Sequence, residues 1–121
     1  DTNILIAYLA GEASVVDTFV HWKAEGKPFY LSAVVEAEIL SFSGWASVKD
    51  RHTAEKFLEQ HFIFVPVDRT IARLTGNIRQ ETNVKLADAS IAATALLTFT
   101  PVVTRNVKDF KKIPDLAIET I

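Results

Sequence analysis

The chain has 121 residues, of which 49% are hydrophobic, and its formal net charge is −2. These values suit one folded domain, and they exclude a disordered chain and a protein that binds nucleic acid through a strong overall positive charge. Cysteine is absent, which excludes disulfides and thiolate metal sites and fits the reducing cytoplasm; no apolar run reaches the roughly 18 to 20 residues that cross a bilayer.

Helical and strand-like segments alternate along the chain. Apolar residues recur with helical spacing after Asp1 and again from about Ser14 to Gly26, and Asp68 can cap a later helix that Asn83 ends. Strands that alternate with helices predict an α/β fold with a parallel sheet between helical layers. Further helices are predicted over 34–42, 50–60, 69–81 and 87–99, strands over 28–33, 61–67, 101–104 and 116–121, and a turn region over 107–115.

The first predicted helix begins at once, whereas in a fold of this class it normally follows a central strand. Methionine is absent from the whole sequence, an initiator included. We therefore expect that a short hydrophobic strand precedes Asp1 in the natural protein. With no repeat, no linker and no low-complexity segment, residues 1–121 are predicted to form a single, N-terminally truncated domain.

Four acidic residues are expected near one edge of the sheet. Asp1 begins the first helix, and Glu38 lies in the helix that follows strand 28–33. Asp88 is in the first turn of the helix that leads to strand 101–104, and Asp109 follows that strand. Because right-handed crossovers bring helix starts back to the carboxyl ends of parallel strands, where ligands bind, the topology gathers these acids.

Carboxylates gathered in this way repel one another unless a cation neutralises them. Hard oxygen ligands select Mg²⁺ or Mn²⁺ over Zn²⁺, and such an ion activates water and stabilises a phosphodiester transition state. The predicted chemistry is metal-assisted phosphodiester hydrolysis. Each acid also has a simpler interpretation, since Asp1 can cap its helix, Asp88 can favour its helix dipole and Asp109 can be a surface turn residue.

Four segments carry a recognisable order of motifs over essentially the whole chain: DTNILIAYL, LSAVVEAEIL, ADASIAATAL and VVTRNVKDFKKIPDL. Together they resemble the PIN-domain ribonucleases, most closely the VapC toxins of type II toxin–antitoxin pairs. The resemblance implies a three-layer α/β/α sandwich with a central parallel sheet. It places Asp1, Glu38 and Asp88 in the three acidic positions of the family, which implies that they hold Mg²⁺ or Mn²⁺.

The closing motif departs from the family. Many members have Asp two residues after the Thr of this motif, where this chain has Asn106. Either Asp109 serves as the fourth acidic group, or Asn106 holds a metal-bound water. In the middle motif Glu36 and Glu38 are about 200° apart on their helix, so only one can face the site, and the motif register selects Glu38.

Several polar residues are expected to support the acids. Thr2, Asn3, Ser32 and Thr104 could orient them, although ordinary capping and turn bonds are the alternative. Arg105 could contact substrate phosphates, with Lys108, Lys111 and Lys112 nearby as either further contacts or a solvated basic turn.

The resemblance implies an endoribonuclease acting on structured RNA, tRNA included, that forms a homodimer and is restrained by a VapB-type antitoxin. Two other functions stay open from the sequence. One is a PIN-like module that binds RNA or a protein without cutting, and the other is a PIN nuclease in RNA processing outside toxin–antitoxin systems. The number of metal ions, one or two, also stays open.

Overall fold

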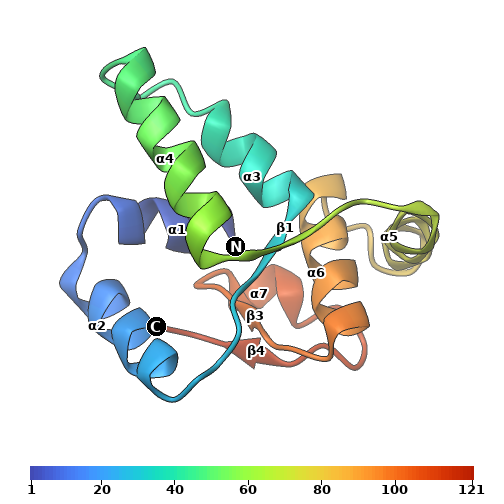
Figure 1. Ribbon diagram of the computed structural model, residues 1–121. Coiled ribbons are helices and arrows are strands. Elements are labelled where there is room, and N and C mark those ends of the chain that lie inside the picture. The colour runs from blue at the N-terminus through green and yellow to red at the C-terminus, as the bar shows by residue number, and fades with distance from the viewer.

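Seven helices and four short strands make up the computed structural model, which describes residues 1–121 (Figure 1). They occur in the predicted order, and the predicted turn region additionally contains a four-residue helix. The elements are α1 Thr2–Leu9, α2 Ala13–Ala24, β1 Tyr30–Ser32, α3 Ala33–Leu40, α4 Val48–His61, β2 Ile63–Val65, α5 Arg69–Thr82, α6 Leu86–Thr98, β3 Val102–Val103, α7 Val107–Phe110 and β4 Ile118–Glu119.

Short polar side chains determine where several helices begin. The Asp1 carboxylate accepts a hydrogen bond from the Ile4 amide at 3.1 Å, and Asp68 accepts one from Ile71 at 2.9 Å. These bonds satisfy amide groups that have no partner inside the helix. Asn83 ends α5 in the left-handed conformation, with φ 58°, which Asn tolerates better than most residues. The predicted cap and break of this helix are both confirmed.

The strands form two separate parallel pairs. β1 pairs with β2, with Leu31 opposite Phe64, and β3 pairs with β4, with Val102 opposite Ile118. Parallel pairing is as predicted, but the expectation of one central sheet holding both 28–33 and 101–104 is wrong for this structure, because the two pairs share no hydrogen bonds. A cavity lined by both β1 and β3 lies between the pairs.

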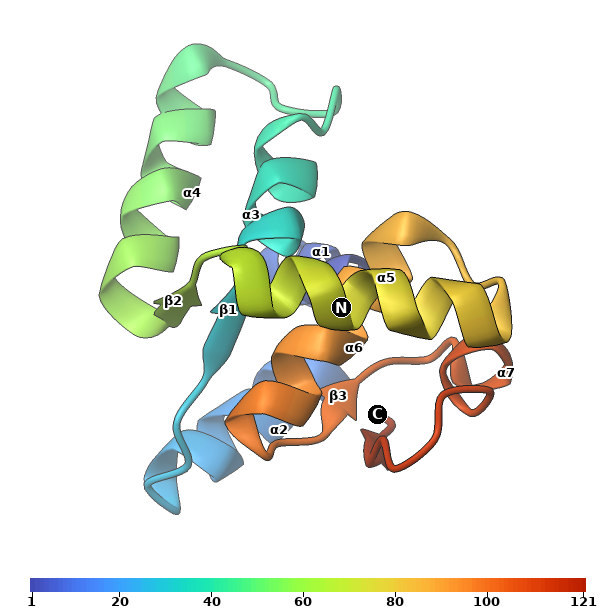
Figure 2. The same cartoon turned by 90° about the vertical axis from the view of Figure 1, so that its right-hand side faces the viewer.

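Helix α6 is the most buried element, and residues 89–95 are all buried. Its Ala-rich sequence lets neighbouring elements approach closely. Helix α5 packs across α6, while α3 and α4 form a hairpin that projects from the rest of the molecule in both views (Figures 1 and 2). The buried hydrophobic core joins all seven helices with β1 and β3.

No single helix is long and apolar enough to cross a bilayer. Helices α1 and α2 reach that length and composition only when taken together, and they are bent by 100° at the break between them.

Candidate active site

Asp1 lies at the junction of α1 and β3. Its backbone nitrogen donates to the carbonyl oxygen of Val103 at 2.5 Å, which holds the residue beside the end of the strand. Its side chain is fixed as well, since Oδ1 accepts from the Ile4 amide and Oδ2 accepts from the Thr104 hydroxyl at 2.5 Å. The Asp1 carboxylate therefore caps α1 and binds Thr104 at the same time, and each oxygen has one donor.

Thr104 connects Asp1 to the closing motif. It is fully buried, and its hydroxyl oxygen also accepts a hydrogen bond from the Asn106 amide at 2.9 Å. Its own amide donates to the Glu119 carbonyl at 3.0 Å, so β4 holds the residue in place. Thr104 thus orients the Asp1 carboxylate, as predicted for this position.

We expect Thr104→Val to keep the volume of this side chain and remove its hydroxyl, leaving Asp1 Oδ2 without its donor. Loss of a hydrogen bond to a charged group should lower the free energy of unfolding by about 1–3 kcal/mol, as measured by denaturant titration. RNA cleavage should fall too, since groups that orient metal ligands typically contribute about 10–100-fold. Thr104→Ser retains the hydroxyl and should cleave normally; equal cleavage by the two variants would contradict this role.

Glu38 reaches the same region from α3. Its Oε1 accepts a hydrogen bond from the Thr2 hydroxyl at 2.6 Å, across 36 positions of sequence. The contact places Glu38 beside the start of α1, as the motif register predicts. Glu38 is exposed and Glu36 is half-buried, so the glutamate that bonds Thr2 is the more exposed of the two.

Asp88 lies in the first turn of α6. Burial raises the pKa of its carboxyl, and the negative charges of Asp109 and Glu38 raise it further. The positive charge of Lys85 partly offsets this increase. The Asp88 carboxylate receives no hydrogen bond from any neighbour that would stabilise its charge. A bound cation would therefore offset the effects that oppose the ionised form of Asp88.

Asp109 and Asn106, the alternatives for the fourth position, are bonded to each other. Asn106 Nδ2 donates to Asp109 Oδ2 at 2.9 Å, and Lys112 Nζ lies 3.6 Å from the other oxygen. The Asn106 hydrogen bond, followed by the positive charge of Lys112, lowers the pKa of Asp109. Asp109 is thus held ionised near Asp88, with Asn106 as its orienting partner.

None of the remaining predicted residues bonds one of the four acids. Ser32 is buried and has the alternative role, capping α3 by accepting from the Val34 amide at 3.3 Å. Asn3 is exposed, and its side chain makes no hydrogen bond. Arg105 does not point freely to substrate, because both of its terminal nitrogens bond the Glu12 carboxylate.

Two residues that interact with the predicted site residues, Lys85 and Glu12, were not predicted. Lys85 stands three positions before Asp88, a spacing that places both near the start of α6 and that could have been noticed in the sequence. Glu12 is 93 positions from Arg105, so no local pattern connects them.

The four carboxylates match a hard divalent cation in their chemistry, since all donors are oxygen. The negative charges of Asp109 and Glu38 act on Asp88 and raise the pKa of its carboxyl. However, no three acidic or histidine side chains of residues 1–121 are close enough in this structure to hold an ion together. The donor set therefore fits a divalent metal, while a preformed metal cage is not present.

In this α/β domain Glu38 bonds Thr2 beside Asp1, and its charge acts on Asp88. Residues 1–116 match the PIN domain family. The chain belongs to that family. It is 30% identical over 132 residues to Ribonuclease VapC of Rickettsia bellii (strain RML369-C), covering 100% of this chain and 93% of the relative.

Solved structures show the same fold. A chain of a toxin–antitoxin complex from Klebsiella pneumoniae is 30% identical, with a TM-score of 0.80 over 100% of this chain and 97% of that one. A chain of VapBC2 from Rickettsia felis, bound to a DNA fragment from its promoter, has a TM-score of 0.84 at 22% identity, over 99% of this chain and 95% of that one. At this lower identity the likeness concerns the fold alone.

Proposed function

We propose that this protein is a Mg²⁺- or Mn²⁺-dependent endoribonuclease and the toxin of a VapB–VapC-type pair. The observation that carries the proposal is that the charges of Asp109 and Glu38 both act on Asp88, and that Glu38 bonds Thr2, the residue next to Asp1. The 30% identity to Ribonuclease VapC over the whole chain supports RNA as the substrate.

Asp1, Glu38 and Asp88 would hold the metal, which when bound supplies a Lewis acid that lowers the pKa of water and stabilises charge on the phosphodiester. The protein contributes orientation. Thr104 keeps the Asp1 carboxylate in place, and Thr2 holds Glu38 toward α1. Because Asp1 is fixed at both oxygens and Asp88 at neither, we expect Asp88 to make the larger adjustment on metal binding.

Retention of three acids favours a nuclease over a PIN-like module that binds RNA or a protein without cutting. The direct test is cleavage of labelled structured RNA, tRNA included, by the purified protein. We expect products with Mg²⁺ or Mn²⁺, none in excess EDTA, and recovery when the metal is restored. Cleavage that persists in EDTA would overturn the metal dependence, and RNA binding without cleavage in either metal would favour the non-catalytic module.

The toxin role and the partner need a separate test. The similar toxin–antitoxin complex supports a VapB-type antitoxin as partner, and we further propose a homodimer in the cytoplasm. Expression of the chain should arrest growth, and co-expression with the protein of the neighbouring gene should relieve the arrest and yield a stable complex. Cleavage in vitro without growth arrest would instead favour a PIN nuclease in RNA processing.

A further inference from the structure

Positive charge near the four acids bears on how RNA binds, because the acids and the RNA backbone are both negative. Two basic residues of the closing motif already have acidic partners. Arg105 bonds the Glu12 carboxylate through both of its terminal nitrogens, and Lys112 Nζ lies 3.6 Å from Asp109 Oδ1. Each would have to give up its partner before it could hold a phosphate.

Lys85 is a basic residue without such a partner. It is exposed at the N-cap of α6, and its ammonium group makes no hydrogen bond or ion pair. Its charge nevertheless reaches the site, because it partly offsets the rise in the Asp88 pKa that burial and the neighbouring carboxylates cause, and it is the only basic side chain with this effect. Lys108 is also unpaired, but its charge acts on Asp109, which Lys112 already contacts.

The backbone that carries Lys85 is fixed on both sides. Val84 before it is buried, and the Val84 carbonyl oxygen accepts a hydrogen bond from Arg79 Nε at 3.2 Å. The carbonyl oxygen of Lys85 accepts one from the Ala89 amide at 2.9 Å, which joins the residue to the first turn of α6. Side chains at the N-cap and at the third helical position are neighbours, so Lys85 and Asp88 lie on the same side of this helix end.

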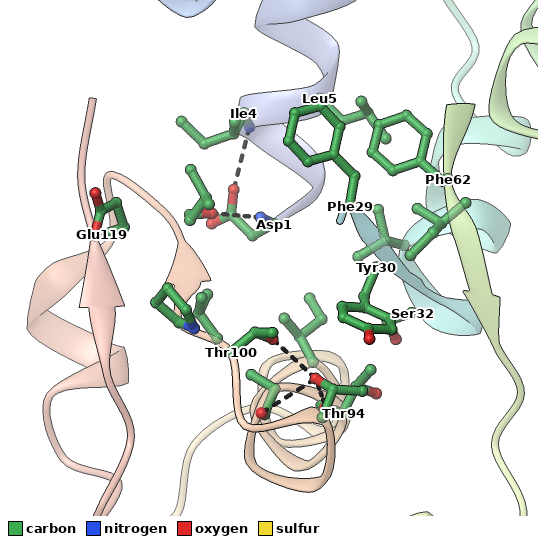
Figure 3. Close-up of a pocket in the computed structure, with 18 of the residues that line it drawn as sticks. Asp1, Ile4, Leu5, Phe29, Tyr30, Ser32, Phe62, Thr94, Thr100 and Glu119 are labelled. Carbon is green, nitrogen blue, oxygen red and sulfur yellow. Dashed lines mark hydrogen bonds between the residues drawn. The ribbon is translucent and has the colours of Figure 1, made fainter. Parts of the chain in front are cut away.

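RNA reaches these residues from the solvent side of the site. Asp1 borders the cavity of about 350 Å³ between the strand pairs, where Figure 3 shows its hydrogen bond to the Ile4 amide. Thirteen of the 22 residues that line this cavity are hydrophobic, so it does not suit a polyanion. Lys85 and Asp88 are not among them, and the exposed lysine meets the RNA outside the cavity.

We propose that Lys85 is a substrate-binding residue, whose ammonium group contacts a phosphate of the RNA beside the bond that is cut. The inference rests on the proposed function, since it names how the same site holds its substrate. A lysine binds phosphate as a compact point charge and reads no base, so this contact strengthens RNA binding whatever the sequence. The alternative is a solvated lysine that only adjusts the charge of Asp88.

The test compares the wild type with Lys85→Gln, Lys85→Arg and the matched control Lys49→Gln. Lys49 is also exposed and unpaired at the start of a helix, α4, but at the far end of the α3–α4 hairpin (Figure 1). Cleavage of labelled tRNA is measured with Mn²⁺ at several RNA and salt concentrations, and binding of the same RNA is measured in excess EDTA. Mn²⁺ affinity is measured without RNA.

We expect Lys85→Gln to raise KM for RNA roughly 10-fold with little change in kcat, as the loss of a hydrogen bond to a charged group implies, and to weaken binding in EDTA by a similar factor. The dependence of log affinity on log salt should become shallower by about 0.7, the value for one phosphate contact on a single strand. Lys85→Arg should restore most of the binding, and Lys49→Gln should behave as the wild type. Mn²⁺ affinity should not fall in Lys85→Gln, because the charge removed is positive.

An unchanged KM and an unchanged salt dependence in Lys85→Gln would overturn the contact, and a change confined to Mn²⁺ affinity would show that Lys85 only adjusts Asp88. An equal loss in Lys49→Gln would also overturn it, because the effect would then come from net charge alone. Wild-type protein that neither binds nor cuts RNA would overturn the proposed function, and this inference with it. The wild type therefore tests the proposed function, and the difference between the two glutamine variants tests the lysine.

Discussion

Asp88→Asn is expected to abolish RNA cleavage while leaving the protein at least as stable as the wild type. Groups that merely orient a metal ligand contribute about 10–100-fold, so removal of a ligand itself should lower the cleavage rate by about 100-fold or more. Stability should not fall, because the Asp88 carboxylate receives no hydrogen bond and its ionised form is opposed by burial and by the charge of Asp109.

The stability effect has a defined pH dependence. The pKa of Asp88 is higher in the folded protein than its ordinary value of 3.8, so the ionised carboxylate destabilises the fold at pH values above the raised pKa. Asp88→Asn should therefore raise the unfolding temperature most at neutral pH. This gain should shrink as the pH falls through the raised pKa, and vanish below 3.8, where wild-type Asp88 is protonated in both states.

Asp17→Asn is the matched control, because it makes the same change on an exposed part of α2. It should alter neither cleavage nor the unfolding temperature by a measurable amount. Cleavage of RNA by the Asp88→Asn protein at the wild-type rate would show that the active site does not require Asp88. A marked loss of stability in this variant would show that the wild-type Asp88 carboxylate stabilises the fold, contrary to the geometry.

Glu38→Gln and Glu36→Gln should differ sharply, although the two glutamates are two positions apart on α3. Glu38 bonds Thr2, its charge acts on Asp88 and it is proposed as a metal ligand, so its replacement by a neutral amide should lower cleavage by about 100-fold or more, as for Asp88. Glu36 has no such contact with the acids, and its replacement should change the rate by no more than about 2-fold, as for other surface substitutions.

Cleavage rates of both variants, measured at saturating metal, separate the two glutamates. Glu38→Gln should also bind Mn²⁺ more weakly, whereas Glu36→Gln should bind it as the wild type does. A loss confined to Glu36→Gln would mean that the middle motif is aligned two residues out of register, and that α3 turns its other face to the metal in the active protein.

Much of the fold could be predicted because local chemistry determines it. Asp68 and Asn83 define the two ends of α5 through a side-chain cap and a left-handed residue. The helix predicted over 87–99 is observed as α6, Leu86–Thr98. The positions of Asp1 and Glu38 followed from motif order, and the Thr2–Glu38 hydrogen bond agrees with the chosen register.

The rest depends on contacts between distant parts of the chain. Whether β1 and β3 share one sheet depends on which strands pair, which the strand patterns themselves do not determine. Exposure of Glu38 depends on where α3 meets α1, and the bond between Arg105 and Glu12 joins residues 93 positions apart. The choice between Asn106 and Asp109 could not be made from spacing, since the two side chains act as a hydrogen-bonded pair.

Anomalous diffraction from crystals soaked in Mn²⁺ tests the central claim most directly, because it locates the metal without relying on activity. We predict a peak in contact with carboxylate oxygens of Asp1, Glu38 and Asp88, at the roughly 2.0–2.2 Å expected for small divalent ions, and its loss in Asp88→Asn crystals. A peak bound elsewhere, or no peak among these three residues at a Mn²⁺ concentration that supports cleavage, would contradict the account.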